Sequence, residues 1–204
     1  DFYTHTLMTP FFSPHRSPYG PPRVLLAAVG ARMTEVAGEV ADGLMVHPLN
    51  TARYLAEVTV PAIERGRALA GKTRGGFELS APVLVVTGEN EEAEARAAAS
   101  VRSQIAFYAS TPSYRGILEL HGWTGLGEEL NLMSKQGRWG EMGALIDDEM
   151  LEEFAIRAPL DQVAARLDER FGSLLDRISF YAPYVDDPRF WAPVVAGLGA
   201  GGRA

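Results

Sequence analysis

The stretch that decides the fold covers residues 23–50 and reads RVLLAAVGARMTEVAGEVADGLMVHPLN. Its apolar run Val24–Val29 is too short for a buried helix and is followed by Gly30, which is typical of a parallel strand covered on both faces. Leu44–Val46 begins a second strand after Asp42-Gly43. Between the strands, apolar residues at helical spacing predict an amphipathic helix with one apolar face: Met33, Val36, Ala37 and Val40.

The turn at Gly30 is the first candidate for a site. It joins the carboxyl end of a strand to the start of a helix, where the free amides beginning at Ala31 favour an anion. Glycine has no Cβ, so a ligand can approach its backbone closely. The residues alone leave open a second interpretation, in which Gly30 only makes a tight turn. A dinucleotide fingerprint fits poorly, because two further closely spaced glycines are missing.

The rest of the chain alternates strands and helices, except for an irregular helical segment at 111–154 that several glycines interrupt. The expected elements are a helix over 51–70 that Pro61 kinks or restarts, a strand at Leu79–Val86, a helix over 91–108 capped by Asn90, a helix over 159–171, a strand at Arg177–Tyr181 and a short helix opened by Asp187-Pro188.

This alternation predicts an α/β fold with a parallel sheet. Four strands are too few to close a barrel of eight, and 204 residues fall short of the roughly 250 that such a barrel takes. We therefore expect the C-terminal half of a (β/α)8 TIM barrel, strands five to eight, with a helical insertion before the last βα unit. The expected segments are a loop or insertion over 1–22, a partial barrel over 23–198 and a disordered tail over 199–204.

Composition narrows the functional classes. The formal net charge of −7 argues against nucleic acid or an anionic membrane surface as the main partner. No run approaches the length of a spanning helix, and no signal peptide opens the chain, so we expect no membrane partner and a cytoplasmic location. The absence of cysteine excludes disulfides, thiol catalysis and cysteine metal sites. The histidines and carboxylates show no metal-ligand spacing, so we expect no metal.

The string AAVGARMTEVAGEVADG at residues 27–43 strongly resembles the fifth βα unit of luciferase-like monooxygenases, a family that includes oxidoreductases dependent on the deazaflavin coenzyme F420. Four later segments resemble a deazaflavin-associated subgroup: QIAFYASTP at 104–112, LELHGW at 118–123, IDDE at 146–149 and YAPY at 181–184. The resemblance covers about residues 2–198. It implies an eight-stranded barrel of which this chain holds strands five to eight.

The resemblance also implies where the cofactor lies. It places coenzyme F420, or alternatively FMN, at the Gly30 turn and at the loop that follows the second strand, where relatives hold the ribityl or phosphate arm. For His47 the alternative is an ordinary loop histidine, and for Asn50 a helix cap. The cofactor-binding residues implied in this way are Ala27, Ala28, Val29, Gly30, Met33, His47, Pro48, Leu49 and Asn50.

Three further aromatic residues have two possible roles. Phe107, Tyr108 and Tyr114 either line an aromatic substrate pocket or pack in the core, and core packing is favoured. His121, beside Trp123, is expected to pack rather than to bind a metal. The catalytic residues are not identified, because in relatives the first four strands carry the usual acid or base.

The expected function is that of a fragment of a luciferase-like, F420-dependent oxidoreductase that transfers hydride between the deazaflavin and an organic small-molecule substrate. One alternative is an FMN-dependent luciferase-like monooxygenase, and another is a non-catalytic half-barrel that binds or supports a partner. A half-barrel exposes sheet edges and an apolar face, so we also expect a homo-oligomer.

Overall fold

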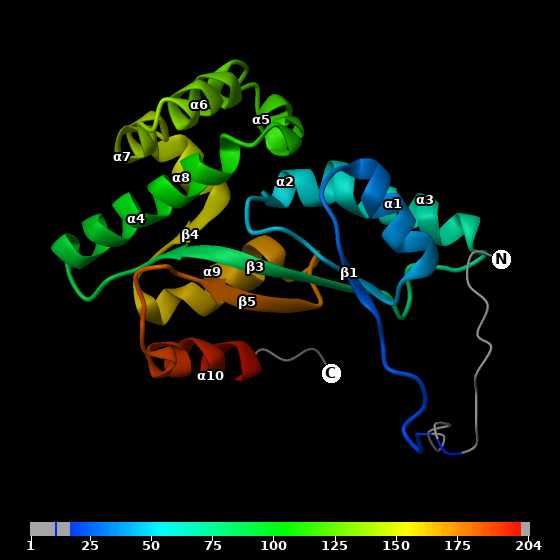
Figure 1. Ribbon diagram of the computed structural model, residues 1–204. Coiled ribbons are helices and arrows are strands. Elements are labelled where there is room, and N and C mark those ends of the chain that lie inside the picture. Colours follow the sequence, from blue (N-terminus) through cyan, green and yellow to red (C-terminus); the bar gives the residue numbers. More distant parts are fainter. Residues whose placement is uncertain (1–10, 12–16, 201–204) are drawn as a thin grey trace.

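The computed structural model describes Phe11 and residues 17–200, which form a five-stranded parallel sheet with helices on both faces (Figure 1). Most of the loop expected over 1–22 lies outside the described residues, as do residues 201–204 of the expected tail. Residues 199 and 200, also expected in that tail, are the end of the last helix. The strands are β1 (Leu25–Ala27), β2 (Gly43–Met45), β3 (Glu78–Val86), β4 (Ala155–Arg157) and β5 (Arg177–Tyr181).

The four strands that the sequence predicts are parallel and adjacent in chain order, which confirms that part of the expectation. β1 pairs with β2 through Ala27 and Met45, and β2 pairs with β3 through Met45 and Ser80. β3 in turn pairs with β5, with Ser80 opposite Arg177 and Leu84 opposite Tyr181. The helix before β2 ends at Val40, and Gly43 is the first residue of β2, where a Cβ would lie 2.6 Å from the carbonyl oxygen of Glu78.

The fifth strand, β4, is not among the strands that the sequence predicts. It pairs with the end of β3, where Leu84 lies opposite Ala155. Leu84 is also paired with Tyr181 of β5, so β4 and β5 lie on opposite edges of β3. Ser80 likewise pairs with both β2 and β5, which places β2 and β4 on the same edge. The first half of this edge of β3 therefore pairs with β2, and the second half pairs with β4.

The helices largely follow the expected pattern. Thr51 and Asn90 cap their helices through side-chain oxygens that accept the amides of Tyr54 and Ala93. A π-helical turn precedes Pro61, because proline has no N–H to donate to the preceding turn. The helical elements are α1 (Ala31–Val40), α2 (Ala52–Tyr54), η2 (Leu55–Thr59), α3 (Val60–Leu69), α4 (Glu91–Ala109), η3 (Pro112–Tyr114), α5 (Arg115–Leu120), α6 (Leu126–Lys135), α7 (Trp139–Met142), η4 (Gly143–Leu145), α8 (Asp148–Phe154), η5 (Leu160–Gln162), α9 (Val163–Phe171), η6 (Pro188–Trp191) and α10 (Ala192–Ala200).

Two hydrophobic cores cover the two faces of β3. Alternate residues, including Val83 and Val85, pack with α1, α3, α9 and α10, whereas Leu84 and Val86 pack with the helices from α4 to α8. Figure 1 shows α4–α8 above β3 and α10 below it. The helices α4–α8 cover only the part of their sheet face that lies near the carboxyl ends of the strands. On the uncovered part, Met45, which is in register with Ser80, remains half exposed.

The expectation of a buried apolar face on α1 is wrong for three of its four residues. Ala37 is fully buried, but Met33, Val36 and Val40 remain 49%, 37% and 65% exposed. The buried side of α1 instead consists of small residues that let it approach α3 closely: Thr34, Ala37 and Gly38. A Cβ on Gly38 would lie 2.5 Å from the carbonyl oxygen of Ile63, so the close crossing decides which side of α1 is buried.

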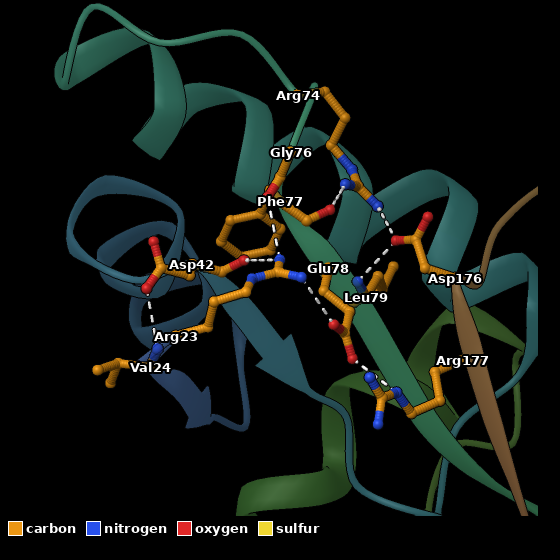
Figure 2. Close-up of polar contacts among 10 residues, drawn as sticks. All are labelled: Arg23, Val24, Asp42, Arg74, Gly76, Phe77, Glu78, Leu79, Asp176 and Arg177. Carbon is orange, nitrogen blue, oxygen red and sulfur yellow. Dashed lines mark hydrogen bonds and ion pairs between the residues drawn. The ribbon is translucent and has the colours of Figure 1, made fainter. Parts of the chain in front are cut away.

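A polar network joins the starts of the strands (Figure 2). Arg23 donates to Glu78 Oε2 and to the carbonyl oxygens of Asp42 and Gly76. Glu78 is nearly buried, and its other oxygen lies 2.8 Å from Nε of Arg177, so one carboxylate pairs with two guanidinium groups.

The same end of the sheet holds a second group of contacts. Asp176 accepts the amide of Leu79 and pairs with Arg74, which also donates to the carbonyl oxygen of Phe77 (Figure 2). These contacts bind the loops that enter β3 and β5 to each other. Ion pairs and capping carboxylates therefore gather at the amino ends of the strands and stabilise the end of the sheet opposite the candidate site.

Candidate functional site

The Gly30 turn lies where β1 leads into α1. Gly30 has φ +79° and ψ 151°, a conformation that residues with a Cβ rarely adopt, and its position is open, because a Cβ placed there would have no atom within 4 Å. No side chain caps α1, and its first turn holds no acidic residue. The amides at the start of α1 are therefore available to an anion, beside the exposed cation Arg32.

A small pocket of about 20 Å³ lies beside this turn. It brings together residues 28–30, the exit loop of β2 and η3, and its lining includes no Asp, Glu, Lys or Arg. The full lining is Ala28, Val29, Gly30, Thr34, Leu44, Val46, His47, Leu49, Asn50, Tyr54, Thr59, Ser113, Tyr114 and Ile117.

The structure thus brings together six of the nine residues expected to bind the cofactor. Ala27, Met33 and Pro48 do not line the pocket. Ala27 and Met33 are exposed next to it, at the end of β1 and in the first turn of α1. Asn50 accepts the amide of Thr51, and Thr51 rather than Asn50 caps α2. The Asn50 side chain therefore lines the pocket while its oxygen orders the exit loop.

His47 is held in a defined orientation by its own loop. Its Nδ1 lies 3.1 Å from the amide of Leu49 and accepts that hydrogen bond. In the neutral ring the proton must then lie on Nε2, which becomes a donor. Burial lowers the pKa of His47, so the neutral form is favoured.

Rings from distant parts of the chain surround His47. It stacks on Tyr114 at 4.5 Å between ring centroids and meets Tyr108 edge to face, also at 4.5 Å. The hydroxyl of Tyr108 lies 2.9 Å from that of Tyr181 at the end of β5. Burial, followed by the hydrogen bond with Tyr181, raises the pKa of Tyr108, so this phenol stays protonated. Tyr181 was not proposed from the sequence as a site residue, and its place at a strand end was the available signal.

The packing role expected for His121 is confirmed by its stacking on Trp123, with ring centroids 4.5 Å apart. Its Nε2 also lies 2.9 Å from Oγ1 of Thr51, which connects α5 to the cap of α2. Sequence reasoning did not predict this contact. Among the described residues, no group of three or more His, Asp or Glu side chains is placed to hold a metal ion.

A family profile described as luciferase-like monooxygenase matches residues 1–177. The chain belongs to this family. A protein of Mycobacterium tuberculosis strain H37Rv, described only as uncharacterized, is 52% identical to this luciferase-like chain over 178 residues. The match covers 87% of this chain and 52% of that relative. The 5,10-methylenetetrahydromethanopterin reductase of Archaeoglobus fulgidus is 28% identical over 151 residues, which cover 72% of this chain and 44% of that enzyme.

Solved structures show the same fold. The coenzyme F420-dependent tetrahydromethanopterin reductase of Methanopyrus kandleri aligns with a TM-score of 0.66 at 24% identity, over 86% of this chain and 49% of that one. An F420-dependent secondary alcohol dehydrogenase aligns with a TM-score of 0.60 at 15% identity, over 89% of this chain and 50% of that one. This luciferase-like chain therefore spans about half the length of the relatives it matches. Within the part that the structure describes, none of the helices has the length and apolar character needed to cross a bilayer.

Proposed function

We propose that this chain is the C-terminal half of the barrel of an F420-dependent oxidoreductase, and that its Gly30 turn holds the anionic part of the deazaflavin. One observation carries the proposal: in a luciferase-like chain, the uncapped start of α1 and the exit loop of β2 meet at one pocket. The comparison with solved structures supports the choice of F420, because two proteins that share the fold carry F420 in their names.

The residues present fit such a group. Gly30 leaves its position open, and no acidic side chain in the first turn of α1 opposes an anion. Free amides and the positive end of the helix dipole favour phosphate or carboxylate there, and Arg32 adds a full charge. His47 Nε2 offers a neutral donor beside them, because Nδ1 is already occupied by Leu49.

When bound, the deazaflavin would supply the hydride. The chain's own residues bind and orient it: the α1 amides hold the anionic arm, and Gly30 admits it to the backbone. No charged side chain lines the pocket, so the region next to His47 is neutral. Tyr108 and Tyr181 place their hydroxyl groups near this end of the sheet.

The replacement Gly30→Val tests this assignment. The valine side chain would occupy the space open to the ligand and disfavour the positive φ, so we expect deazaflavin binding to weaken roughly ten-fold to several hundred-fold. This corresponds to losing one or two charge-assisted hydrogen bonds of about 1.5–3 kcal/mol each. Fluorescence titration of the protein with F420 and with FMN measures both affinities.

Gly71→Val is the matched control, because Gly71 also has a positive φ, +67°, with no atom within 4 Å of an added Cβ, but does not line the pocket. Gly71→Val should introduce the same backbone strain and leave the affinity for F420 unchanged. Equal affinity in wild type and Gly30→Val would remove the turn from the site. Tight binding of FMN with none of F420 would favour the flavin monooxygenase alternative, and binding of neither would favour a non-catalytic half-barrel.

We also propose that the chain self-associates through the exposed face of α1. Val36 and Val40 are 37% and 65% exposed there, next to β1, whose second edge is unpaired among the described residues. Sedimentation velocity should show a species larger than a monomer that Val36→Lys and Val40→Lys shift toward the monomer. Leu132→Lys is the control, because Leu132 of α6 is 57% exposed, between the values for Val36 and Val40. A monomer at every concentration, or an equal shift in the control, would contradict the proposal.

A further inference from the structure

A second cavity, of about 370 Å³, lies at the carboxyl ends of β3 and β5. Its walls are the loop that follows β3, one side of the first two turns of α4 and the segment that follows β5. Figure 1 shows these segments at the same end of the sheet. The second cavity shares no lining residue with the pocket at Gly30, so it is a separate place in the fold.

Thr87 lines the second cavity, and its hydroxyl group has no partner. The residue is 1% exposed, and Oγ1 makes no hydrogen bond with the described residues. The backbone of Thr87 is fixed, because its amide donates to the hydroxyl of Tyr184 at 3.0 Å. Buried polar atoms in native proteins are almost always hydrogen-bonded, so an unpaired hydroxyl in a cavity wall points to a ligand that supplies the partner.

The charged side chains of the lining leave an excess of negative charge. Asp187 pairs with an arginine of its own segment, and Arg96 pairs with a glutamate of its own helix. Glu89 and Asp186 also line the cavity, and neither makes an ion pair with the described residues. Two carboxylates that are not neutralised favour a cation in the space between them.

The start of α4 does not make this an anion site. The lining residues Ala93, Arg96 and Ala97 are three and four positions apart, so the cavity runs along the side of α4 and not beyond its end. The amide of Ala93 is already bound by the side chain of Asn90. Three glutamates occupy the first turn of α4 and repel an anion.

The remaining side chains of the lining suit an apolar body. Val185 and two alanines of α4 offer aliphatic surface, and Tyr184 and Phe190 offer rings. The Phe190 ring is held in place, because it meets Trp191 edge to face with centroids 5.1 Å apart. Aromatic rings also attract cations. The volume of the cavity is that of a site for one small organic molecule.

We propose that the second cavity binds an organic ammonium ion with a small apolar body. The ammonium group donates a hydrogen bond to Oγ1 of Thr87, and the body packs against Tyr184 and Phe190. Glu89 and Asp186 act through their charge and need not touch the ligand. This site goes beyond the proposed function, because it takes a cation where the deazaflavin site takes an anion, and it needs no F420.

The probe is para-fluorophenethylamine, which is protonated at neutral pH, and its neutral counterpart is para-fluorophenethyl alcohol. Fluorine NMR titration of the protein measures both affinities. The wild type should bind the amine about ten-fold or more tightly than the alcohol, and added salt should weaken binding of the amine. Equal affinity for the two probes would overturn the proposal without any variant.

Thr87→Val should weaken binding of the amine about ten-fold, the loss of one hydrogen bond to a charged group, whereas Thr87→Ser should retain it. The free energy of unfolding should stay the same or rise in Thr87→Val, because valine has a similar shape and removes a hydroxyl that has no partner in the protein. Unchanged amine binding in Thr87→Val would show that water and not the ligand satisfies this hydroxyl, and would overturn the proposal.

The charge contribution is tested with the double variant Glu89→Gln, Asp186→Asn, which should weaken amine binding about three- to ten-fold. The matched control is Glu64→Gln, Glu91→Gln. It changes the net charge by the same amount at two exposed carboxylates outside the lining, and it should leave the affinity nearly unchanged. An equal loss in both double variants would mean that only the overall charge of the protein attracts the amine, and would contradict a site in the second cavity.

Discussion

Replacing Gly66 by alanine is expected to lower the free energy of unfolding by about 3 kcal/mol or more. A Cβ at this position would lie 1.9 Å from the carbonyl oxygen of Glu35 and 2.8 Å from the amide nitrogen of Glu39. Both atoms belong to the backbone of α1, so no side chain can rotate away and the two helices must separate. Urea or thermal unfolding followed by circular dichroism measures the loss.

Gly140→Ala is the matched control for this substitution. Gly140 lies in α7, and a Cβ added there would have no atom within 4 Å. Alanine is the better helix former, so the control should be neutral or slightly stabilising. If both variants unfold alike, α1 does not approach α3 as closely as described. Because α1 carries the Gly30 turn at its start, Gly66→Ala should also disturb the pocket.

Tyr184→Phe is expected to lower the free energy of unfolding by about 2–4 kcal/mol. The hydroxyl of Tyr184 donates to the carbonyl oxygen of Val85 and accepts the amide of Thr87, both at 3.0 Å. One side-chain oxygen thus replaces a pairing strand on the β5 edge, just where β3 ends. Val85 and Thr87 are buried, so phenylalanine would leave two backbone groups without partners and without water.

The control here is Tyr54→Phe, because the Tyr54 hydroxyl makes no hydrogen bond with the described residues. It should change the free energy of unfolding by well under 1 kcal/mol. A loss for Tyr184→Phe no larger than for Tyr54→Phe would show that the end of β3 does not need this bridge. Chemical denaturation of both variants under the same conditions decides the comparison.

The strands were predictable where an apolar run stands between turn residues. Leu79–Val86 is such a run, and it lies within β3. β4 was not predictable in this way, because Ala155–Arg157 follows α8 directly and continues its apolar spacing. Only the free edge of β3, set by residues far away in sequence, makes those three residues a strand.

Periodicity predicted the existence of α1 but not its buried side. The pattern Met33, Val36, Val40 marks an apolar stripe, and a stripe does not say which element covers it. The small residues Gly38 and Gly66 decided the packing, since only they allow the crossing with α3. Glycines spaced on two consecutive helices were the available signal.

The candidate site, too, was predictable from the sequence only in part. The Gly30 turn and His47 were accessible to sequence reasoning because each directly follows a predicted strand. The contacts of His47 with Tyr108 and Tyr114 join residues more than sixty positions apart, and a single sequence does not reveal such pairs. The favoured expectation of core packing for Tyr108 and Tyr114 is supported, since both pack against the core, whereas Phe107 is half exposed.

The shared edge of β3 has a consequence for the order of events during synthesis. β2 precedes β3 closely in the chain, so the first half of one edge of β3 finds a partner at once, but β5, which covers the other edge, begins only at Arg177. At about 5–20 residues per second, the segment between them takes on the order of 5–20 s to leave the ribosome. Throughout that interval β3, the longest strand that the structure describes, has its β5 edge open. The nascent chain is therefore most prone to faulty pairing before Arg177–Tyr181 emerges, and that is when we expect a chaperone to matter most.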